Sequence, residues 1–294
     1  MKVGVVGLGR MGLAIVERLS SQGFDDLVAW DREPGRVLLA VEAGARSATD
    51  AAAVVRHAEI VVSIINDDAG ARRLYNGSRG LLDGGVDGKL FIEMSTLQPA
   101  TVRELSALVE AGGGRLIGAP VMGSIPTVRN GKLFIPAGGR VEDIERAQPV
   151  FTALTRRVKH VGPVGAGNAM KLAVNLTMAA YLQALAEGLA LGVGEGLSLD
   201  DMLEVLGEAP TANGWLASKL PVLKGGRSDT TLDIASLRKD MLSAVATGAL
   251  AGVPMTMAGA LVATLSAAVA QGAGGEDLAQ LPRLVRDHLV QRPA

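Results

Sequence analysis

The sequence contains no cysteine in its 294 residues, and aromatic residues make up only 3% of it. The first absence excludes thiol catalysis, disulfide bonds and cysteine-ligated metal, and the second leaves few side chains on which nucleic-acid bases could stack. Charges nearly balance, with 29 lysines and arginines against 30 aspartates and glutamates, and there is no basic run. We therefore expect no nucleic-acid partner.

Metal ligands and membrane segments are scarce as well. The three histidines, His57, His160 and His288, are far apart and none belongs to a metal-ligand spacing, so we expect no metal site. No charge-free apolar stretch is long enough to span a bilayer, and the N-terminus lacks the pattern of a signal peptide. With 48% hydrophobic residues, the chain is expected to be a cytoplasmic globular protein of one or two domains, without a membrane partner.

The first chemical pattern is a glycine-rich turn near the N-terminus, in the run K-V-G-V-V-G-L-G-R-M-G. An apolar strand leads into Gly7, Gly9 and Gly12, and an amphipathic segment from Arg10 to Ser21 follows. Gly7 allows the tight turn, Gly9 lets a pyrophosphate approach the backbone, and Gly12 lets the helix pack closely on the strand. The N–H groups at the start of that helix would meet the phosphates. The predicted cofactor-binding turn comprises Gly7, Leu8, Gly9, Arg10, Met11 and Gly12.

An acidic residue follows at the distance that a dinucleotide site requires. A second strand-like run, residues 27–30, ends in Asp31, roughly 20 residues beyond the last glycine, where a carboxylate can hold the adenosine ribose. A chain with 38 glycines also produces this spacing by chance, and the alternative is a structural turn with a surface aspartate. Asp31 favours NAD, whereas Arg32 and Arg36 could clamp the 2′-phosphate of NADP, so both cofactors stay open.

Strand-like and helical segments alternate through the first half of the chain. Apolar runs occur at 59–65, 89–94, 115–121, 132–137 and 157–161, with helical segments at 33–43, 51–57, 98–110 and 141–154. This alternation predicts an α/β fold with a mainly parallel, doubly wound sheet.

The pattern changes after the glycine cluster at residues 162–167. Only helical segments follow, at 169–191, 200–208, 215–223, 231–251 and 254–271, and the polar tail from residue 286 is expected to fray. We predict a dinucleotide-binding domain over residues 1–162 and an all-helical domain over residues 163–294.

Ligands of open α/β sheets bind beyond the carboxyl ends of the strands. Besides the glycine turn and Asp31, those ends carry Ile65 and Asn66, Ser95 and Thr96, and the loop from Pro120 to Ser124. Small hydroxyl and glycine-rich groups gather there without a strong acid.

Lys171 is the best candidate for a group that moves a proton. It lies just inside the first long helix, directly after the glycine cluster, and Asn175 follows one helical turn later on the same face. A lysine serves as a general acid when partial burial lowers its pKa towards the working pH. The alternative is a solvated helix lysine beside a surface asparagine.

Two positions in the helical half have both a structural and a functional interpretation. Arg238, Lys239 and Asp240 form a charge cluster on a helix, which is more often a solvated face, but Lys239 could also face the cleft and touch the cofactor. Trp215 is more often core packing than the wall of a substrate pocket.

Taken together, these motifs resemble the β-hydroxyacid dehydrogenases, the family of 3-hydroxyisobutyrate dehydrogenase and tartronate semialdehyde reductase. The resemblance covers the whole length. It rests on G-L-G-R-M-G at the start, M-S-T-L-Q-P at 94–99, A-P-V-M-G-S at 119–124, G-A-G-N-A-M-K-L-A-V-N at 165–175 and R-K-D-M at 238–241.

The resemblance implies a Rossmann domain followed by an all-α domain, and an NAD(P)-dependent enzyme that acts on a small 3-hydroxy acid or the matching semialdehyde. It implies a homodimer or homotetramer formed through the C-terminal helices. Lys171 would be the acid–base and Asn175 would orient the substrate. Ser95, Gly123 and Ser124 would line the substrate site, with Met122 and Trp215 beside them, while Asn66, Thr96 and Lys239 would approach the cofactor.

One loop departs from the family pattern D-A-P-V-S-G-G. Met122 stands where the family has serine, and Ser124 stands where it has the last glycine. A larger or less polar carbonyl compound therefore becomes possible.

Two alternatives remain at this point. An NADPH-dependent imine reductase would share the architecture, but such enzymes usually carry Asp or Tyr in place of Lys171. A non-catalytic dinucleotide-binding interaction module would lack the lysine altogether.

Overall fold

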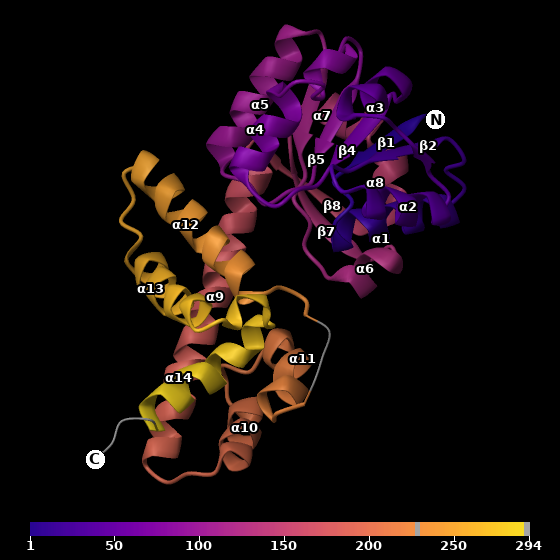
Figure 1. Ribbon diagram of the computed structural model, residues 1–294. Helices are drawn as coiled ribbons and strands as arrows, with labels where there is room; N and C mark the ends of the chain where they lie inside the picture. Colours follow the sequence, from indigo (N-terminus) through magenta and orange to yellow (C-terminus); the bar gives the residue numbers. More distant parts are fainter. Residues whose placement is uncertain (227–229, 291–294) are drawn as a thin grey trace. The chain divides into compact units, whose positions relative to one another are not determined.

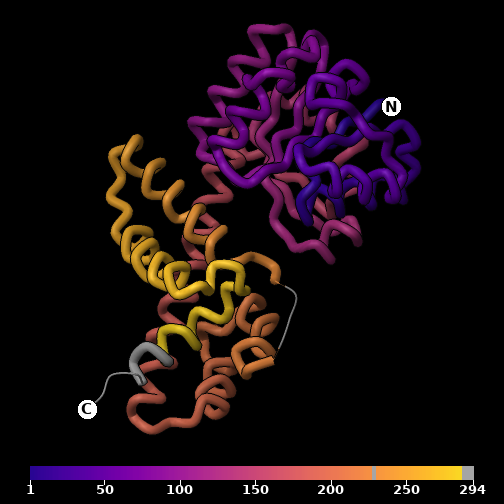
Figure 2. Tube along the Cα trace, viewed as in Figure 1, coloured from indigo at the N-terminus to yellow at the C-terminus, as the bar shows by residue number. Residues whose placement is uncertain are grey.

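The computed structural model describes residues 1–226 and 230–290, with side chains through residue 286. The chain divides into two compact units, Met1–Ala173 and Val174–Ala294, which we call the first and the second unit. Within the described residues the first unit contains the sheet and the second unit is helical. Figure 1 labels these elements, and Figure 2 traces the chain from indigo at the N-terminus to yellow at the C-terminus. The boundary predicted after residue 162 stays a prediction.

The first unit is built on one eight-stranded sheet in the order β3-β2-β1-β4-β5-β6-β7-β8. All neighbouring strands run parallel except β6 and β7, which are antiparallel, so the expected doubly wound, mainly parallel sheet is confirmed. The strands are β1 Val3–Val6, β2 Leu27–Trp30, β3 Arg46–Ser47, β4 Ile60–Ser63, β5 Leu90–Glu93, β6 Arg115–Gly118, β7 Leu133–Gly138 and β8 Thr155–Gly162. The helices are α1 Arg10–Ser21, α2 Pro34–Glu42, α3 Ala51–His57, α4 Asp68–Asn76, η1 Leu82–Gly84, α5 Pro99–Ala111, α6 Ile125–Arg129, α7 Val141–Arg146 and α8 Gln148–Leu154.

Helices cover both faces of the sheet. Successive residues of a strand point to opposite faces, so each strand contributes side chains to both layers. Val3 and Val5 of β1 join one buried cluster, while Val6 joins another. Val62 and Val61 of β4 divide in the same way. The first cluster includes residues of α1 and α8, and the second includes residues of α3, α4 and α5. Strands buried on both faces explain the continuous apolar runs of the sequence.

A single helix, α9 (Ala166–Gly194), begins in the first unit and continues into the second. The other helices of the second unit are α10 Leu199–Glu208, α11 Gly214–Leu223, α12 Ile234–Leu250, α13 Thr256–Ala270, η2 Ala273–Gly275, η3 Leu278–Gln280 and α14 Leu281–Val290. Ala179, Leu182, Leu185 and Leu189 recur every three or four residues along α9 and are buried in the two hydrophobic clusters of this unit or beside them. The all-helical second half is therefore confirmed.

Among the described residues, α9 is also the one helix whose length and composition would allow it to cross a membrane. Its mean hydropathy reaches 1.4 over an 18-residue window, and 39% of that window is buried inside the structure. The core helix of a helical domain has the same properties, so this criterion alone does not distinguish the two.

Two segments differ from the sequence-based expectation. The helix expected at 141–154 is interrupted at Ala147, because Pro149 in the first turn of α8 has no N–H to donate to the carbonyl four residues earlier. The polar tail expected to fray from residue 286 instead continues α14 to Val290. Residues 291–294 lie outside the described part of the chain.

Candidate active site

The glycine turn between β1 and α1 has the geometry that its spacing predicts. Gly7 has a φ of +88°, which only glycine adopts easily, and a Cβ at Gly12 would lie 1.9 Å from the Gly7 carbonyl oxygen. A Cβ at Gly9, by contrast, would meet nothing within 4 Å. Gly9 therefore leaves open space beside the first turn of α1, where no side chain caps the helix.

Asp31 lies directly beside this turn, at the end of β2. Its Oδ2 accepts the Leu8 N–H at 2.7 Å, and its Oδ1 accepts the Glu33 N–H at 2.9 Å. The Arg36 Nη1 approaches Oδ2 at 3.7 Å. The residue is only 9% exposed, so the carboxylate is held in one orientation against the glycine turn.

These residues line a pocket of about 300 Å³ that lies wholly within the first unit. Its wall combines the glycine turn, the end of β2, the loop after β4 and the start of α4. The predicted cofactor residues that it brings together are Gly7, Gly9, Asp31, Arg32, Ile65 and Asn66, and it adds Trp30, Arg36 and Arg73. Leu8 is instead buried under the turn.

A dinucleotide fits this set of residues. Open space at Gly9 beside a helix N-terminus suits a pyrophosphate, and a fixed carboxylate at the end of β2 suits a ribose. Arg73 was not predicted, because only the fold places α4 beside the end of β2.

Ser95 is placed under the site by three hydrogen bonds. It is 1% exposed, and its Oγ accepts the Ile65 N–H at 2.8 Å. Its carbonyl accepts Asn168 Nδ2 of α9 at 3.1 Å, and its own N–H donates to Glu93 Oε1 at 2.9 Å. The hydroxyl thus links the loops that follow β4 and β5, and the predicted contact of Ser95 with substrate stays a prediction.

The loop from Pro120 to Ser124 is anchored by its neighbours. Met122 exchanges two backbone hydrogen bonds with Phe134, of 2.9 and 3.0 Å. Gly123 has a φ of +147°, and the Ser124 Oγ lies 3.0 Å from the Thr127 Oγ1. The two residues that depart from the family pattern therefore flank a glycine whose conformation disfavours any other residue.

The proton-transfer candidates lie on α9. Lys171 is half-buried and belongs to the first unit, while Asn175 belongs to the second and is 4% exposed. The Asn175 Nδ2 donates to the Asp240 Oδ2 at 2.6 Å. Since a carboxylate only accepts, this bond fixes which end of the Asn175 amide faces Asp240.

The charge cluster on α12 is only partly solvated. Asp240 is 2% exposed, and its Oδ1 pairs with the Lys239 Nζ at 2.8 Å. The Arg238 Nε donates to the Ser266 Oγ at 2.7 Å. The solvated-face interpretation is therefore wrong for Asp240, which the helical unit buries, whereas Arg238 and Lys239 stay partly exposed. Asp240 was missed as a partner of Asn175, although an acidic residue among small apolar ones was a signal.

Trp215 packs inside the helical unit. Its ring meets that of Tyr181 edge to face, with centroids 5.9 Å apart, and it borders both hydrophobic clusters of the second unit. Its predicted role at the substrate stays a prediction, as do those of Thr96 and Lys239 at the cofactor. No group of three or more metal-binding side chains occurs among the described residues.

The sequence matches two families in succession. Residues 2–162 match the family described as the NAD binding domain of 6-phosphogluconate dehydrogenase. Residues 165–285 match the family described as the NAD-binding of NADP-dependent 3-hydroxyisobutyrate dehydrogenase.

Individual proteins resemble the chain over most of its length. Glyoxylate/succinic semialdehyde reductase 1 of Arabidopsis thaliana is 30% identical over 97% of this chain and 99% of that protein. Cytokine-like nuclear factor N-PAC of Homo sapiens is 31% identical over 88% of this chain. That match covers only 47% of the length of N-PAC. Among solved structures, 3-hydroxyisobutyrate dehydrogenase of Mycobacterium tuberculosis has the same fold, with a TM-score of 0.86 at 24% identity, over 97% of this chain and 99% of that one.

Fold and pocket thus define a dinucleotide-dependent oxidoreductase with a Rossmann domain and a helical domain. The chain belongs to the β-hydroxyacid dehydrogenase family. It is an NAD(P)-dependent oxidoreductase that acts on a CH–OH group, and the comparisons favour this activity over imine reduction and over a non-catalytic module.

Proposed function

We propose that the protein interconverts small 3-hydroxy acids and the matching semialdehydes, with Lys171 as general acid and base. The observation that carries this proposal is the Lys171–Asn175 spacing on α9, in which Asn175 is buried and held by Asp240. The semialdehyde reductase that resembles this chain over nearly its full length supports the substrate class.

The chemistry needs a hydride and a proton. A bound NAD(P) supplies or takes up the hydride at the carbonyl carbon. Lys171 gives a proton to the carbonyl oxygen in reduction and removes it from the hydroxyl in oxidation. Because the Asn175 nitrogen faces Asp240, its amide oxygen is left to accept a hydrogen bond from an ammonium or a hydroxyl group.

The matched variants Lys171→Ala and Lys171→Arg test this assignment. Alanine should lower kcat by about 10²–10⁴-fold, because no other group replaces the proton donor. Arginine keeps the charge but cannot release a proton, so it should be nearly as inactive. Cofactor dissociation constants, measured by fluorescence, should stay within a factor of about three, since Lys171 is not needed for the pocket of the first unit. Near wild-type turnover in either variant would show that Lys171 is not the proton donor.

The substrate class is tested by a screen. We expect higher kcat/KM for succinic and tartronate semialdehyde than for cyclic imines, with Ser95, Met122, Gly123, Ser124 and Trp215 lining the substrate. A preference for imines would contradict the proposal.

For the cofactor, we propose a preference for NAD. The support is that both oxygens of Asp31 are held by backbone N–H groups, so the carboxylate cannot turn away to admit a 2′-phosphate. Arg32, Arg36 and Arg73 line the same pocket and favour the opposite choice. Dissociation constants for NADH and NADPH decide between them, and a preference of about tenfold for NADPH would overturn the proposal.

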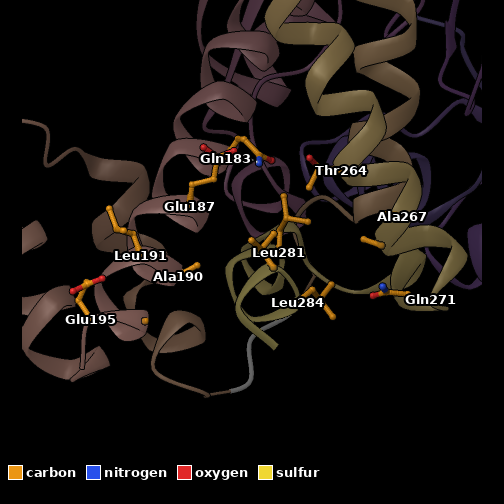
Figure 3. Close-up of a pocket in the computed structure, with 13 residues that line it drawn as sticks. Gln183, Glu187, Ala190, Leu191, Glu195, Thr264, Ala267, Gln271, Leu281 and Leu284 are labelled. Carbon is orange, nitrogen blue, oxygen red and sulfur yellow. Dashed lines mark hydrogen bonds between the residues drawn. The ribbon is translucent and has the colours of Figure 1, made fainter. Parts of the chain in front are cut away.

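We also propose a homodimer or homotetramer that forms through the helical unit. The support is an apolar pocket of about 610 Å³ between α9, α13 and α14. Figure 3 shows Leu281 and Leu284 between the side chains of α9, among them Leu191, and those of α13. Leu191 is 68% exposed, and exposed apolar surface of this kind often marks an interface.

We also propose that the protein is located in the cytoplasm. A chain without cysteine forms no disulfide, so its chemistry does not require an oxidising compartment. Fractionation of cells that express the tagged protein tests this, and recovery with the membranes would contradict it.

A further inference from the structure

The strand β5 ends on a buried carboxylate that the proton and hydride steps do not use. Glu93 is 0% exposed, and no ion pair to it occurs among the residues whose side chains are described. Burial raises the pKa of the Glu93 carboxyl, although hydrogen bonds from Ser63, Ser95 and Tyr75 oppose that shift. An unpaired carboxylate in such a place is costly, and it therefore calls for an explanation.

Every hydrogen-bond partner of Glu93 is a donor. The Ser63 hydroxyl of β4 donates to Oε2 at 2.6 Å, and the Tyr75 hydroxyl of α4 donates to the same oxygen at 3.2 Å. The Ser95 N–H donates to Oε1 at 2.9 Å. The Ser63 and Tyr75 hydroxyls lie 2.9 Å apart, and each can also accept a hydrogen bond, so the pair can serve either the ionised or the protonated carboxyl group. In both forms Oε1 accepts the Ser95 N–H.

The contacts of Glu93 continue to the surface of the cofactor pocket. Ser95, held through its N–H, accepts the Ile65 N–H on its own Oγ at 2.8 Å. Ile65 and its neighbours after β4 line that pocket. One buried carboxylate thus sets the backbone position of the loops after β4 and β5.

Strand order indicates which part of a dinucleotide lies over these loops. The pyrophosphate belongs at the turn after β1, and Asp31 after β2 marks the adenosine side. β4 and β5 lie on the other side of β1, beyond the point where the strand order reverses. The nicotinamide half therefore lies over the loops that Glu93 holds.

We propose that Glu93 is a positioning residue for the nicotinamide half of the cofactor, acting through Ser95 and Ile65 rather than by touching the ligand. The proposal rests on the dinucleotide site described above and is independent of the substrate and of Lys171. Ser63 and Tyr75 hold the other carboxyl oxygen, Oε2, in place.

Binding of two probes to the Glu93→Ala variant, which removes the acceptor of the Ser95 N–H, tests this proposal without reference to turnover. ADP-ribose contains the adenosine half and the pyrophosphate, and NADH or NADPH adds the nicotinamide. We expect the variant to bind the complete cofactor about tenfold more weakly while its affinity for ADP-ribose stays within about twofold. Glu93→Gln should recover part of the loss, because its amide oxygen can still accept the Ser95 N–H.

Two further measurements separate positioning from a general loss of structure. Ser63→Ala removes one partner of the carboxyl group but leaves the group itself. It should shift the ratio of the two dissociation constants in the same direction by a smaller factor, and it serves if Glu93→Ala does not fold. Amide hydrogen exchange at Ile65 should accelerate in both variants, because the Ser95 Oγ is no longer fixed. Equal loss of both probes, or no loss of either, would overturn the proposal, whereas inactive Lys171 variants would leave it untouched.

Discussion

Gly9 and Gly12 belong to the same turn but have different neighbours. We therefore expect Gly9 to matter for cofactor binding and Gly12 for folding. Gly9 has a φ of −63°, which alanine adopts readily, and a Cβ there would meet no atom within 4 Å. At Gly12 a Cβ would overlap the carbonyl oxygen of Gly7. The first position is therefore open to ligand, and the second is needed for the packing of α1 on β1.

We predict opposite phenotypes for alanine at these positions. Gly9→Ala should leave the free energy of unfolding within about 1 kcal/mol of wild type but weaken cofactor binding by about tenfold or more, because its methyl group occupies the approach to the phosphates. Gly12→Ala should destabilise the protein by about 1–3 kcal/mol, since α1 must shift. Chemical denaturation and fluorescence titration measure the two effects. Full cofactor affinity in Gly9→Ala would place the pyrophosphate elsewhere.

Glu93 makes stability depend on pH in a predictable direction. Its pKa in the folded protein is raised by burial above the ordinary value of 4.5, so the folded state holds the proton more tightly than the unfolded state. Its contribution to stability is therefore present below pH 4.5 and is lost as pH rises through the folded-state pKa. The unfolding temperature of Glu93→Gln, relative to wild type, should rise across that window. A pH-independent difference would indicate that Glu93 is not shifted.

At the scale of elements, an ion pair connects α11 to the segment before η3. The Lys219 Nζ lies 2.8 Å from the Asp277 Oδ2, and the two side chains are 7% and 5% exposed. Burial by itself would raise the pKa of Asp277, but hydrogen bonds from Lys219 and from the N–H groups of Ala279 and Thr231 outweigh it and lower the pKa. This contribution to stability is present above pH 3.8 and is lost as pH falls through the folded-state pKa.

Asp277→Asn should lower the free energy of unfolding of the helical unit by about 3–5 kcal/mol, because it leaves a buried ammonium without its counter-charge. Trp30 lies in the first unit and Trp215 in the second, and the chain has two tryptophans. Urea denaturation followed by fluorescence in a Trp30→Phe background therefore reports on the helical unit. As a control, Asp200→Asn removes an exposed pair with Lys224, at 3.8 Å, and should change stability by less than about 0.5 kcal/mol. Equal effects of the two substitutions would refute this role of the buried pair.

At the scale of the whole molecule, each unit has hydrophobic clusters of its own. The apolar side chains that remain exposed in the helical unit include Leu191 in the wall of the 610 Å³ pocket and Val205 on α10 outside it. Both are 68% exposed, so they form a matched pair for testing assembly.

Leu191→Asp should shift the protein from dimer or tetramer towards monomer in light scattering, because a charge is buried at the interface. Val205→Asp should leave the mass unchanged. A dimer that survives the first substitution, or dissociates with the second, would show that the pocket of α9, α13 and α14 is not the interface.

Local sequence patterns predicted most of the architecture. Apolar runs of four to eight residues, the G-x-G-x-x-G turn and Asp31 each express their role within a short stretch, so the parallel sheet, the glycine turn and the helical half are apparent from residue order alone. Hydrophobic periodicity alone predicted one helix over residues 141–154. It did not take account of Pro149, whose missing N–H separates α7 from α8.

By itself, the amino-acid sequence determined the fold class, the dinucleotide turn and the position of Lys171 near the start of a long helix, since each depends on neighbours within a few residues. Only the tertiary structure decided that Ser63 donates to Glu93 across 30 residues, that Asp240 orients Asn175 across 65, and that Lys219 pairs with Asp277 across 58. The physical reason is that a buried polar side chain takes its partner from whichever element folds against it, and no periodicity along the chain records that choice.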